Sequence, residues 1–207
     1  MTVAYGNAKE SYSWKNRATA SHPWFQPIED SERIHYQHKK TDFIDFSIQK
    51  LLPHKFSEYG PAMAVGDVNS DGLDDIFIGG SGFNPTTLLL QQKDGTFINR
   101  NILPGQNKKD WDDMGLVLFD ADNDGDLDLY IAAGGYENAP NSPAYEDKLY
   151  INDGKGHFTL NTTALPRNLV SKSCVRAIDY DNDGDLDLFV AGRVFPVDYP
   201  RPVSSAI

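Results

Sequence analysis

An eight-residue string, DNDGDLDL, occurs twice in this 207-residue chain, at residues 122–129 and 181–188. With the two residues before it and without its final Leu, each copy becomes a nine-residue stretch: DADNDGDLD at 120–128 (loop 2) and DYDNDGDLD at 179–187 (loop 3). A more divergent copy, DVNSDGLDD, stands at 67–75 (loop 1). The three loops hold 14 of the 30 acidic residues, so the negative charge is concentrated at specific sites.

The spacing within loop 2 predicts a set of converging oxygen atoms. Its acidic residues occupy positions 1, 3, 5, 7 and 9: Asp120, Asp122, Asp124, Asp126 and Asp128. Alternate side chains of a curled loop can turn their oxygens toward one point, and position 7 can offer its backbone carbonyl. Gly125 at position 6 permits the sharp turn that this requires. Five or more oxygen ligands could therefore meet at one cation.

Carboxylates held this close destabilise one another unless a cation neutralises them. An all-oxygen set without His or Cys favours a hard divalent ion over zinc or copper. Mg²⁺ keeps its waters and demands a strict octahedron, whereas Ca²⁺ accepts irregular oxygen shells. The sequence therefore predicts Ca²⁺ as cofactor, with about three sites, and the alternative is an Asp/Asn/Gly-rich surface turn without metal.

The EF-hand loop opens with the same spacing, but it ends in a bidentate Glu at position 12 and lies between helices. Position 12 is Ile78, Ile131 and Val190 in the three copies. These residues fall inside apolar, strand-like runs, so the pattern excludes an EF-hand.

Short apolar runs flank every loop and must position it. AMAVG, GLVLF and CVRAI precede the loops, and IFIGG, LYIAAGG and LFVAG follow them, which predicts that each loop joins two β-strands. After the first two copies, TLLLQQ to TFIN around KDG and KLYIN to HFTL around NDGKG have the composition of hairpins. Four antiparallel strands that recur at intervals of 53 and 59 residues predict an all-β fold of β-propeller blades.

The pattern Asp-x-Asp/Asn-x-Asp-Gly-x-x-Asp, followed by an apolar strand, resembles the calcium loop of FG-GAP/VCBS repeats, the units of integrin α-like propellers. Longer phrases, GPAMAVGDVNSDGLDDIFIGG, LYINDGKGHF and SCVRAIDYDNDGDLDLFVAGR, resemble bacterial ASPIC/UnbV-type proteins related to cartilage acidic protein. The resemblance extends over about residues 43 to 200.

The resemblance implies one metal site in each loop. The implied side-chain ligands are Asp67, Asn69, Asp71 and Asp75 in loop 1, Asp120, Asp122, Asp124 and Asp128 in loop 2, and Asp179, Asp181, Asp183 and Asp187 in loop 3. The implied carbonyl ligands are those of Leu73, Asp126 and Asp185.

The chain divides into an N-terminal arm or linker with a possible edge strand, 1–42, and a repeat region, 43–207. Repeats are expected near 60–110, 111–168 and 169–207, the last one incomplete, which gives a partial propeller of about three blades. Residues 28–50, which contain the alternating patterns IHY (34–36) and FIDFSI (43–48), predict one or two further strands. We expect a fragment of a larger protein, with open blade edges through which copies could associate.

The expected function is a non-catalytic module for extracellular binding, adhesion or scaffolding, with a protein or a glycan as ligand. The alternative is a fragment of a propeller-based, lyase-like carbohydrate-active enzyme, which would need a catalytic constellation. The five histidines form no recognisable nucleophile or metal pattern: His22, His35, His38, His54 and His157. We therefore expect no catalysis.

The net charge of −11 argues against a nucleic acid partner, because phosphate binding needs clustered Lys and Arg. No apolar run reaches 18 residues, so membrane insertion is not expected. The start, MTVAYGNAKESYSWKN, lacks the apolar segment of a signal peptide. An extracellular, cell-surface or periplasmic location is expected from calcium availability and from the resemblance.

Overall fold

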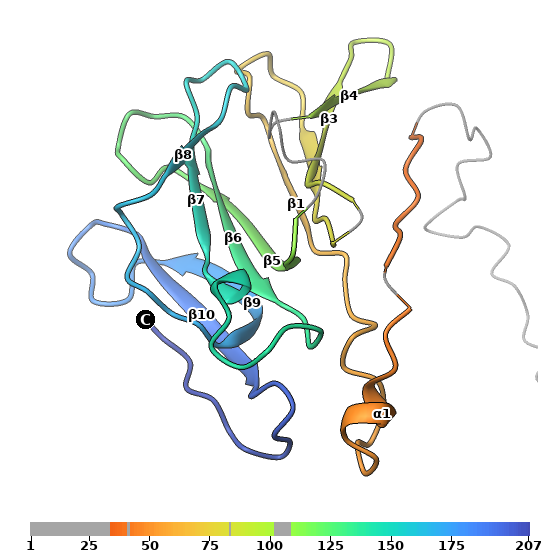
Figure 1. Ribbon diagram of the computed structural model, residues 1–207. Helices are drawn as coiled ribbons and strands as arrows, with labels where there is room; N and C mark the ends of the chain where they lie inside the picture. The colour runs from red at the N-terminus through yellow and green to blue at the C-terminus, as the bar shows by residue number, and fades with distance from the viewer. Residues whose placement is uncertain (1–33, 41, 83, 102–108) are drawn as a thin grey trace, which may run out of the picture. The chain divides into compact units, whose positions relative to one another are not determined.

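A computed structural model of the protein describes residues 34–40, 42–82, 84–101 and 109–207 (Figure 1). All of them belong to one compact unit, Glu32–Ile207. The predicted arm at 1–42 lies mostly outside the described residues, as does His22, and its role stays a prediction. Among the described residues, no helix has the length and apolar composition that crossing a bilayer would require.

The described chain forms propeller-like blades of antiparallel strands, which confirms the predicted all-β fold. Blade 1 contains β1 (Met63–Gly66), β2 (Asp75–Ile78), β3 (Thr87–Gln91) and β4 (Phe97–Asn101). Blade 2 contains β5 (Asp112–Phe119), β6 (Asp128–Gly134), β7 (Lys148–Ile151) and β8 (Thr159–Asn161). Blade 3 contains the pair β9 (Ser171–Ile178) and β10 (Asp187–Val194). In each blade, strands that follow one another in the sequence are neighbours in the sheet.

Blade 3 continues the sheet of blade 2 at one point, where Gly134 of β6 and Lys172 of β9 pair in parallel. The first strands of the three blades lie beside one another, because β5 contacts both β1 and β9. The repeating unit is therefore a meander whose first strand lies beside the first strand of the next blade.

Each acidic loop connects the first two strands of its blade in the same register. The residue before position 1 pairs with the residue at position 9: Gly66 with Asp75, Phe119 with Asp128 and Ile178 with Asp187. The two strands therefore hold the ends of the loop side by side. The eight residues between the paired positions have to reverse the chain between neighbouring strands.

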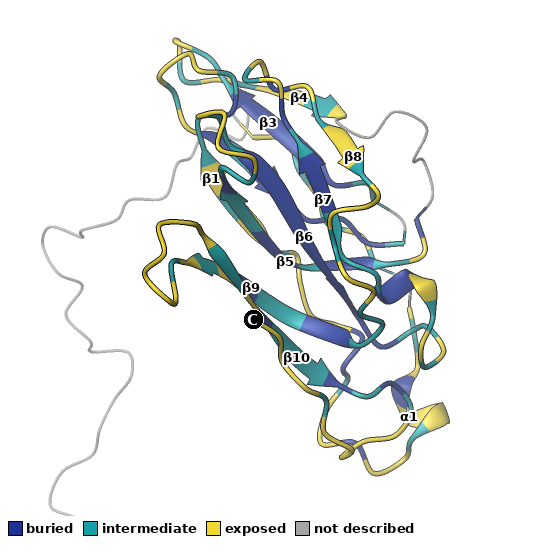
Figure 2. Ribbon diagram, turned by 90° about the vertical axis from the view of Figure 1, so that its left-hand side faces the viewer, coloured by how far each residue is buried: buried dark blue, intermediate teal, exposed yellow. Residues whose placement is uncertain are grey.

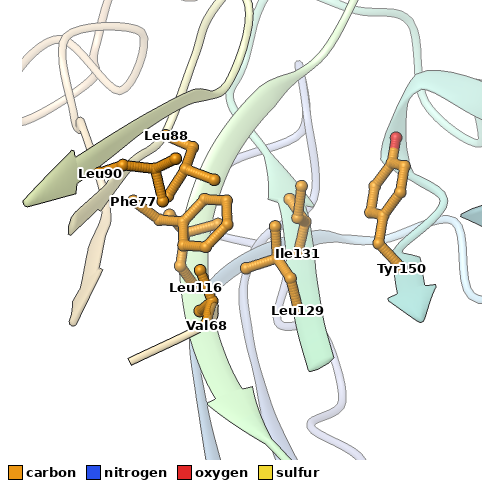
Figure 3. Close-up of a cluster of buried hydrophobic side chains, with 8 residues drawn as sticks. All are labelled: Val68, Phe77, Leu88, Leu90, Leu116, Leu129, Ile131 and Tyr150. Atoms are coloured by element: carbon orange, nitrogen blue, oxygen red, sulfur yellow. The ribbon is translucent and has the colours of Figure 1, made fainter. Parts of the chain in front are cut away.

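The two larger clusters of the core are apolar layers on the two faces of blade 2. Successive strand residues point to opposite faces of a sheet. On β6, Leu129 and Ile131 therefore pack into the layer shared with blade 1, together with Phe77 (Figure 3). Tyr130 and Ala132 of the same strand pack into the layer shared with blade 3. Figure 2 shows this arrangement as dark blue strands in β6 and β7, with exposed residues mostly in the loops.

The strands predicted from the alternating patterns at 34–36 and 43–48 are wrong. Residues 34–36 are not in a strand, and α1 (Asp45–Ile48) is a single helical turn. The buried Asp45 carboxylate accepts hydrogen bonds from the backbone N–H groups of Phe56 and Ser57, which fixes a reversal of the chain. Ile44 next to this turn remains 57% exposed, so the alternating pattern does not correspond to a buried sheet face.

Truncation of the layer between blades 1 and 2 tests whether face-to-face stacking stabilises the fold. Leu129 is fully buried there, and Leu129→Ala should lower the free energy of unfolding by about 2–5 kcal/mol in chemical denaturation. Leu51→Ala is the matched control, because Leu51 is 94% exposed and its loss should change stability by less than about 0.5 kcal/mol. Equal losses in the two variants would contradict the assignment of the core.

Candidate metal sites

The three loops have the same backbone conformation. Position 4 is left-handed in each, at Ser70 (φ 59°), Asn123 (φ 61°) and Asn182 (φ 60°), and so is position 6, at Gly72 (φ 85°), Gly125 (φ 93°) and Gly184 (φ 99°). Asn tolerates this region better than most residues, and glycine adopts it without steric cost. The agreement shows that the repeat aligned in the sequence is also a repeat in the geometry of the backbone.

Hydrogen bonds from the backbone fold each loop around its first aspartate. The N–H of position 6 donates to the carboxylate of position 1 in every copy: Gly72 to Asp67 (2.8 Å), Gly125 to Asp120 (3.0 Å) and Gly184 to Asp179 (3.2 Å). The N–H of position 7 donates to the carboxylate of position 5 in the same way, at 2.9, 3.1 and 3.0 Å in loops 1, 2 and 3. Backbone dipoles therefore hold the carboxylates at positions 1 and 5 in place.

Position 9 has an additional role that the sequence did not indicate. Asp75 and Asp128 are fully buried. The carboxylate of each accepts a hydrogen bond from the backbone N–H at position 2 of the same loop. The other carboxylate oxygen accepts a backbone N–H from the third strand of the blade or from the residue just beyond it. In blade 1 the donor is Gln91, the last residue of β3, which donates to Asp75 (2.8 Å). In blade 2 the donor is Asn152, the residue after β7, which donates to Asp128 (2.8 Å). The aspartate that ends the loop therefore also attaches the loop to its blade.

The structure brings together part of each predicted ligand set. Oxygens of Asp120, Asp122 and Asp124 lie within 4.8 Å of one another in loop 2, as do oxygens of Asp179, Asp181 and Asp187 in loop 3. Asp128 and Asp183 are outside these groups. Among the described residues, loop 1 forms no group of three carboxylates at this separation, and its position 3 is Asn69. The Asn69 amide instead donates to Asp71 (3.0 Å).

The donor set fits a hard cation. The grouped atoms are carboxylate oxygens, and Oδ1 of Asp179, at position 1 of loop 3, is buried without a hydrogen-bond donor among the described residues. A carboxylate oxygen in this state has lone pairs available for a cation. The carbonyls of Leu73, Asp126 and Asp185 stay predicted ligands, and so does the complete set in each loop.

Burial and mutual repulsion raise the pKa of several loop carboxyls. Burial is the main cause of the raised pKa of Asp75 and of Asp128, and their N–H donors counteract it only in part. Burial also raises the pKa of Asp126, with further contributions from Asp124 and the other loop 2 carboxylates. The metal-free loops therefore carry unfavourable negative charge at neutral pH, which a bound cation would offset.

Comparison with known protein families gives a match at these loops. A model of FG-GAP-like repeats matches residues 67–131 and 133–190, which is more than half of the chain. The chain belongs to the FG-GAP-like repeat family. Such repeats imply propeller-like blades and are generally non-catalytic. No curated protein matched the chain.

The first FG-GAP-like match begins at position 1 of loop 1, and the second ends in β10, just beyond loop 3. The family match therefore contains all three acidic loops, while β1, the strand that leads into loop 1, lies just before it. Kinship with ASPIC/UnbV-type proteins and with cartilage acidic protein stays a prediction.

The described histidines of this FG-GAP-like protein share no site. His38 contacts the Tyr36 hydroxyl (2.9 Å), His54 contacts the Tyr59 hydroxyl (2.5 Å) and His157 contacts Asp153 (2.9 Å). Each of these three partners lies within five residues of its histidine in the sequence. Among the described residues, nothing favours the lyase-like alternative over a non-catalytic module.

Buried ion pairs join the blades at the strand ends opposite the acidic loops. Lys109 pairs with Asp113 (2.5 Å), and Asp113 also accepts the N–H of Gly80 and the hydroxyl of Thr86 from blade 1. Between blades 2 and 3, Lys172 pairs with Asp147 (3.1 Å). Sequence reasoning missed both pairs. Lys172 and Asp147 lie far apart in the chain, whereas the i,i+4 spacing of Lys109 and Asp113 was a local signal that could have indicated theirs.

The raised pKa of Asp126 predicts a pH dependence of the metal-free protein. A raised pKa means that the folded chain binds this proton more tightly than the unfolded chain does, so the contribution to stability is lost as pH rises through that pKa. In EDTA at pH 7, Asp126→Asn should therefore stabilise the protein, by about 0.5 kcal/mol for a partly exposed charge.

The same comparison at about pH 3.5, below the usual aspartate pKa of about 3.9, is the internal control. The gain should disappear there, because Asp126 is then largely protonated in both states. Chemical denaturation at the two pH values measures the difference in unfolding free energy between Asp126→Asn and the original chain. A gain in stability that does not change with pH would contradict the electrostatic explanation.

Proposed function

We propose that this FG-GAP-like protein is a calcium-binding, non-catalytic β-propeller repeat module that serves binding, adhesion or scaffolding outside the cell. One observation carries the proposal: three loops at the same place in three blades share two left-handed positions, and in each the carboxylate at position 1 accepts the N–H of position 6. A surface turn without a ligand has no need for this agreement.

Calcium is the cation that the loop chemistry favours. The donors are oxygens, two loops hold three carboxylates within 4.8 Å, and in loop 2 burial and the neighbouring carboxylates raise the pKa of Asp126. Extracellular modules bind Ca²⁺ with dissociation constants of about 10⁻⁴ to 10⁻³ M. At a tenfold excess each site would add about 1.4 kcal/mol, and three sites about 4 kcal/mol, to a typical stability of about 5–15 kcal/mol.

The ions in this proposal are structural, and other loops of the blades would present a protein or glycan ligand. Affinity in this range suits an extracellular, cell-surface or periplasmic location, where calcium is abundant. Copies of the chain could also associate through blade 3, where Ile178 (54%) and Phe189 (38%) are exposed on β9 and β10. The proposal includes a relationship between this chain and ASPIC/UnbV-type proteins.

Thermal unfolding tests the calcium proposal. The unfolding midpoint should rise by roughly 10 °C between excess EDTA and about 10 mM Ca²⁺, because filled sites stabilise only the folded chain. The same concentration of Mg²⁺ should give a much smaller shift, since these irregular oxygen sets do not suit an octahedral ion. Identical cooperative transitions in EDTA and in Ca²⁺ would leave the loops as acidic turns.

Two single substitutions in loop 1 separate calcium binding from a general effect of charge. Asp71→Ala removes a predicted ligand at position 5 and should abolish at least about one third of the calcium-induced rise, the share of one site in three. Asp74→Ala is the matched control, because it removes the same charge at position 8, where no ligand is predicted. Equal effects of the two variants in Ca²⁺ would contradict the ligand assignment.

A further inference from the structure

Asn152 bridges two acidic loops that belong to different blades. It directly follows β7 of blade 2 and is 4% exposed. Its Nδ2 donates to the carbonyl of Val68 in loop 1 (2.8 Å) and to the carbonyl of Leu127 in loop 2 (3.1 Å), while its backbone N–H donates to Asp128. One buried side chain therefore spans the backbones of loops 1 and 2.

These contacts complete a continuous path between the two buried position 9 carboxylates. Val68 donates its N–H to Asp75 of loop 1 (3.2 Å) and accepts the Asn152 amide at its carbonyl. Asn152 then donates its backbone N–H to Asp128 of loop 2 (2.8 Å). Val68 lies between Asp67 and Asn69, two predicted ligands of loop 1. A cation that orders these ligands would therefore also fix the backbone of Val68, which contacts Asn152.

The turn that carries Asn152 is held firmly against blade 1. Asn152 Oδ1 accepts the N–H of Gly156 (3.1 Å), and Arg100 of β4 donates to the Gly156 carbonyl (3.3 Å). Beyond the turn, the ring of Phe158 packs edge-on against Phe77 of blade 1, with centroids 5.3 Å apart. The turn is therefore anchored to blade 1, and a displacement of one loop acts on the Asn152 side chain without moving the whole turn.

We propose that Asn152 is a positioning residue that couples calcium binding at loop 1 to calcium binding at loop 2. The inference rests on the calcium function proposed above. Both loops use the same amide of this anchored residue, and either ion, by ordering its own loop, aligns the Asn152 Nδ2 in the geometry that the other loop requires. Each site therefore binds more tightly when the other is filled.

Loop 3 provides a comparison within the same chain. Its hydrogen bonds among the described residues run within the loop, as from Tyr180 N to Asp187 and from Gly184 N to Asp179. Loop 3 should therefore bind calcium independently of the other two. Gln91 provides a second comparison, because it occupies the place of Asn152 in blade 1 and its backbone N–H likewise donates to position 9 of its own loop, at Asp75.

A calcium titration of the ¹⁵N-glycine-labelled full chain, followed by NMR, tests the coupling. The amides of Gly72, Gly125 and Gly184 each donate to position 1 of their own loop and report the three sites separately. Asp122→Ala weakens loop 2 at an exposed ligand position and leaves Asn152 intact. It should reduce the calcium affinity reported by Gly72 by about fivefold or more, while the affinity reported by Gly184 stays unchanged.

A second titration asks whether Asn152 carries the effect. Asn152→Ser removes the bridging amide but keeps the backbone N–H, and in this background Asp122→Ala should no longer change the affinity reported by Gly72. Gln91→Ser is the matched control and should preserve the coupling. An effect of Asp122→Ala that is as large in the Asn152→Ser background as in the original chain would overturn the role of Asn152.

The remaining outcomes separate the inference from the function on which it rests. If all three glycine amides respond to calcium but Asp122→Ala leaves Gly72 unaffected, the calcium function stands and the coupling is wrong. This comparison needs no substitution at Asn152, so it does not depend on how well that variant folds. If calcium shifts none of the three amides, the calcium function itself is wrong and the coupling falls with it.

Discussion

One buried carboxylate at the end of each of the first two acidic loops connects loop, strand pair and blade. Asp75 and Asp128 pair across the sheet with the residue before their loop, accept an N–H from position 2 and accept another from beside the third strand. These donors compensate only part of the cost of burying a charge, which is why burial still raises the pKa of both groups. The loop can neither slide along its strands nor open without breaking these bonds.

The blades are joined by different interactions along their length. Apolar layers fill the middle, on both faces of β6. Buried ion pairs, such as Lys172 with Asp147, join the ends opposite the loops. At the loop ends, like charges are concentrated, and hydrogen bonds from Asn152 and from Arg100 join blades 1 and 2. A cation in each loop would convert the repulsive end of the stack into a stabilising one, and that is the physical basis of the proposed function.

The sequence was sufficient for the local features and insufficient for contacts between distant residues. The strands on both sides of each loop, the two hairpins and the register of the three copies follow from short-range patterns, and the structure contains all of them. The bridge from Asn152 to Val68 spans 84 residues, and nothing in NDGKG indicates it. The alternating FIDFSI segment failed for the same reason, because Asp45 finds its partners more than ten residues away.

The number of calcium ions bound per chain tests the central claim most directly. Native mass spectrometry of the full chain, together with equilibrium dialysis against ⁴⁵Ca²⁺ in excess Mg²⁺, would measure it. The account predicts about three ions, one for each loop, with little competition from Mg²⁺. A chain that binds no Ca²⁺ at millimolar concentrations, or binds Mg²⁺ equally well at the same sites, would contradict it.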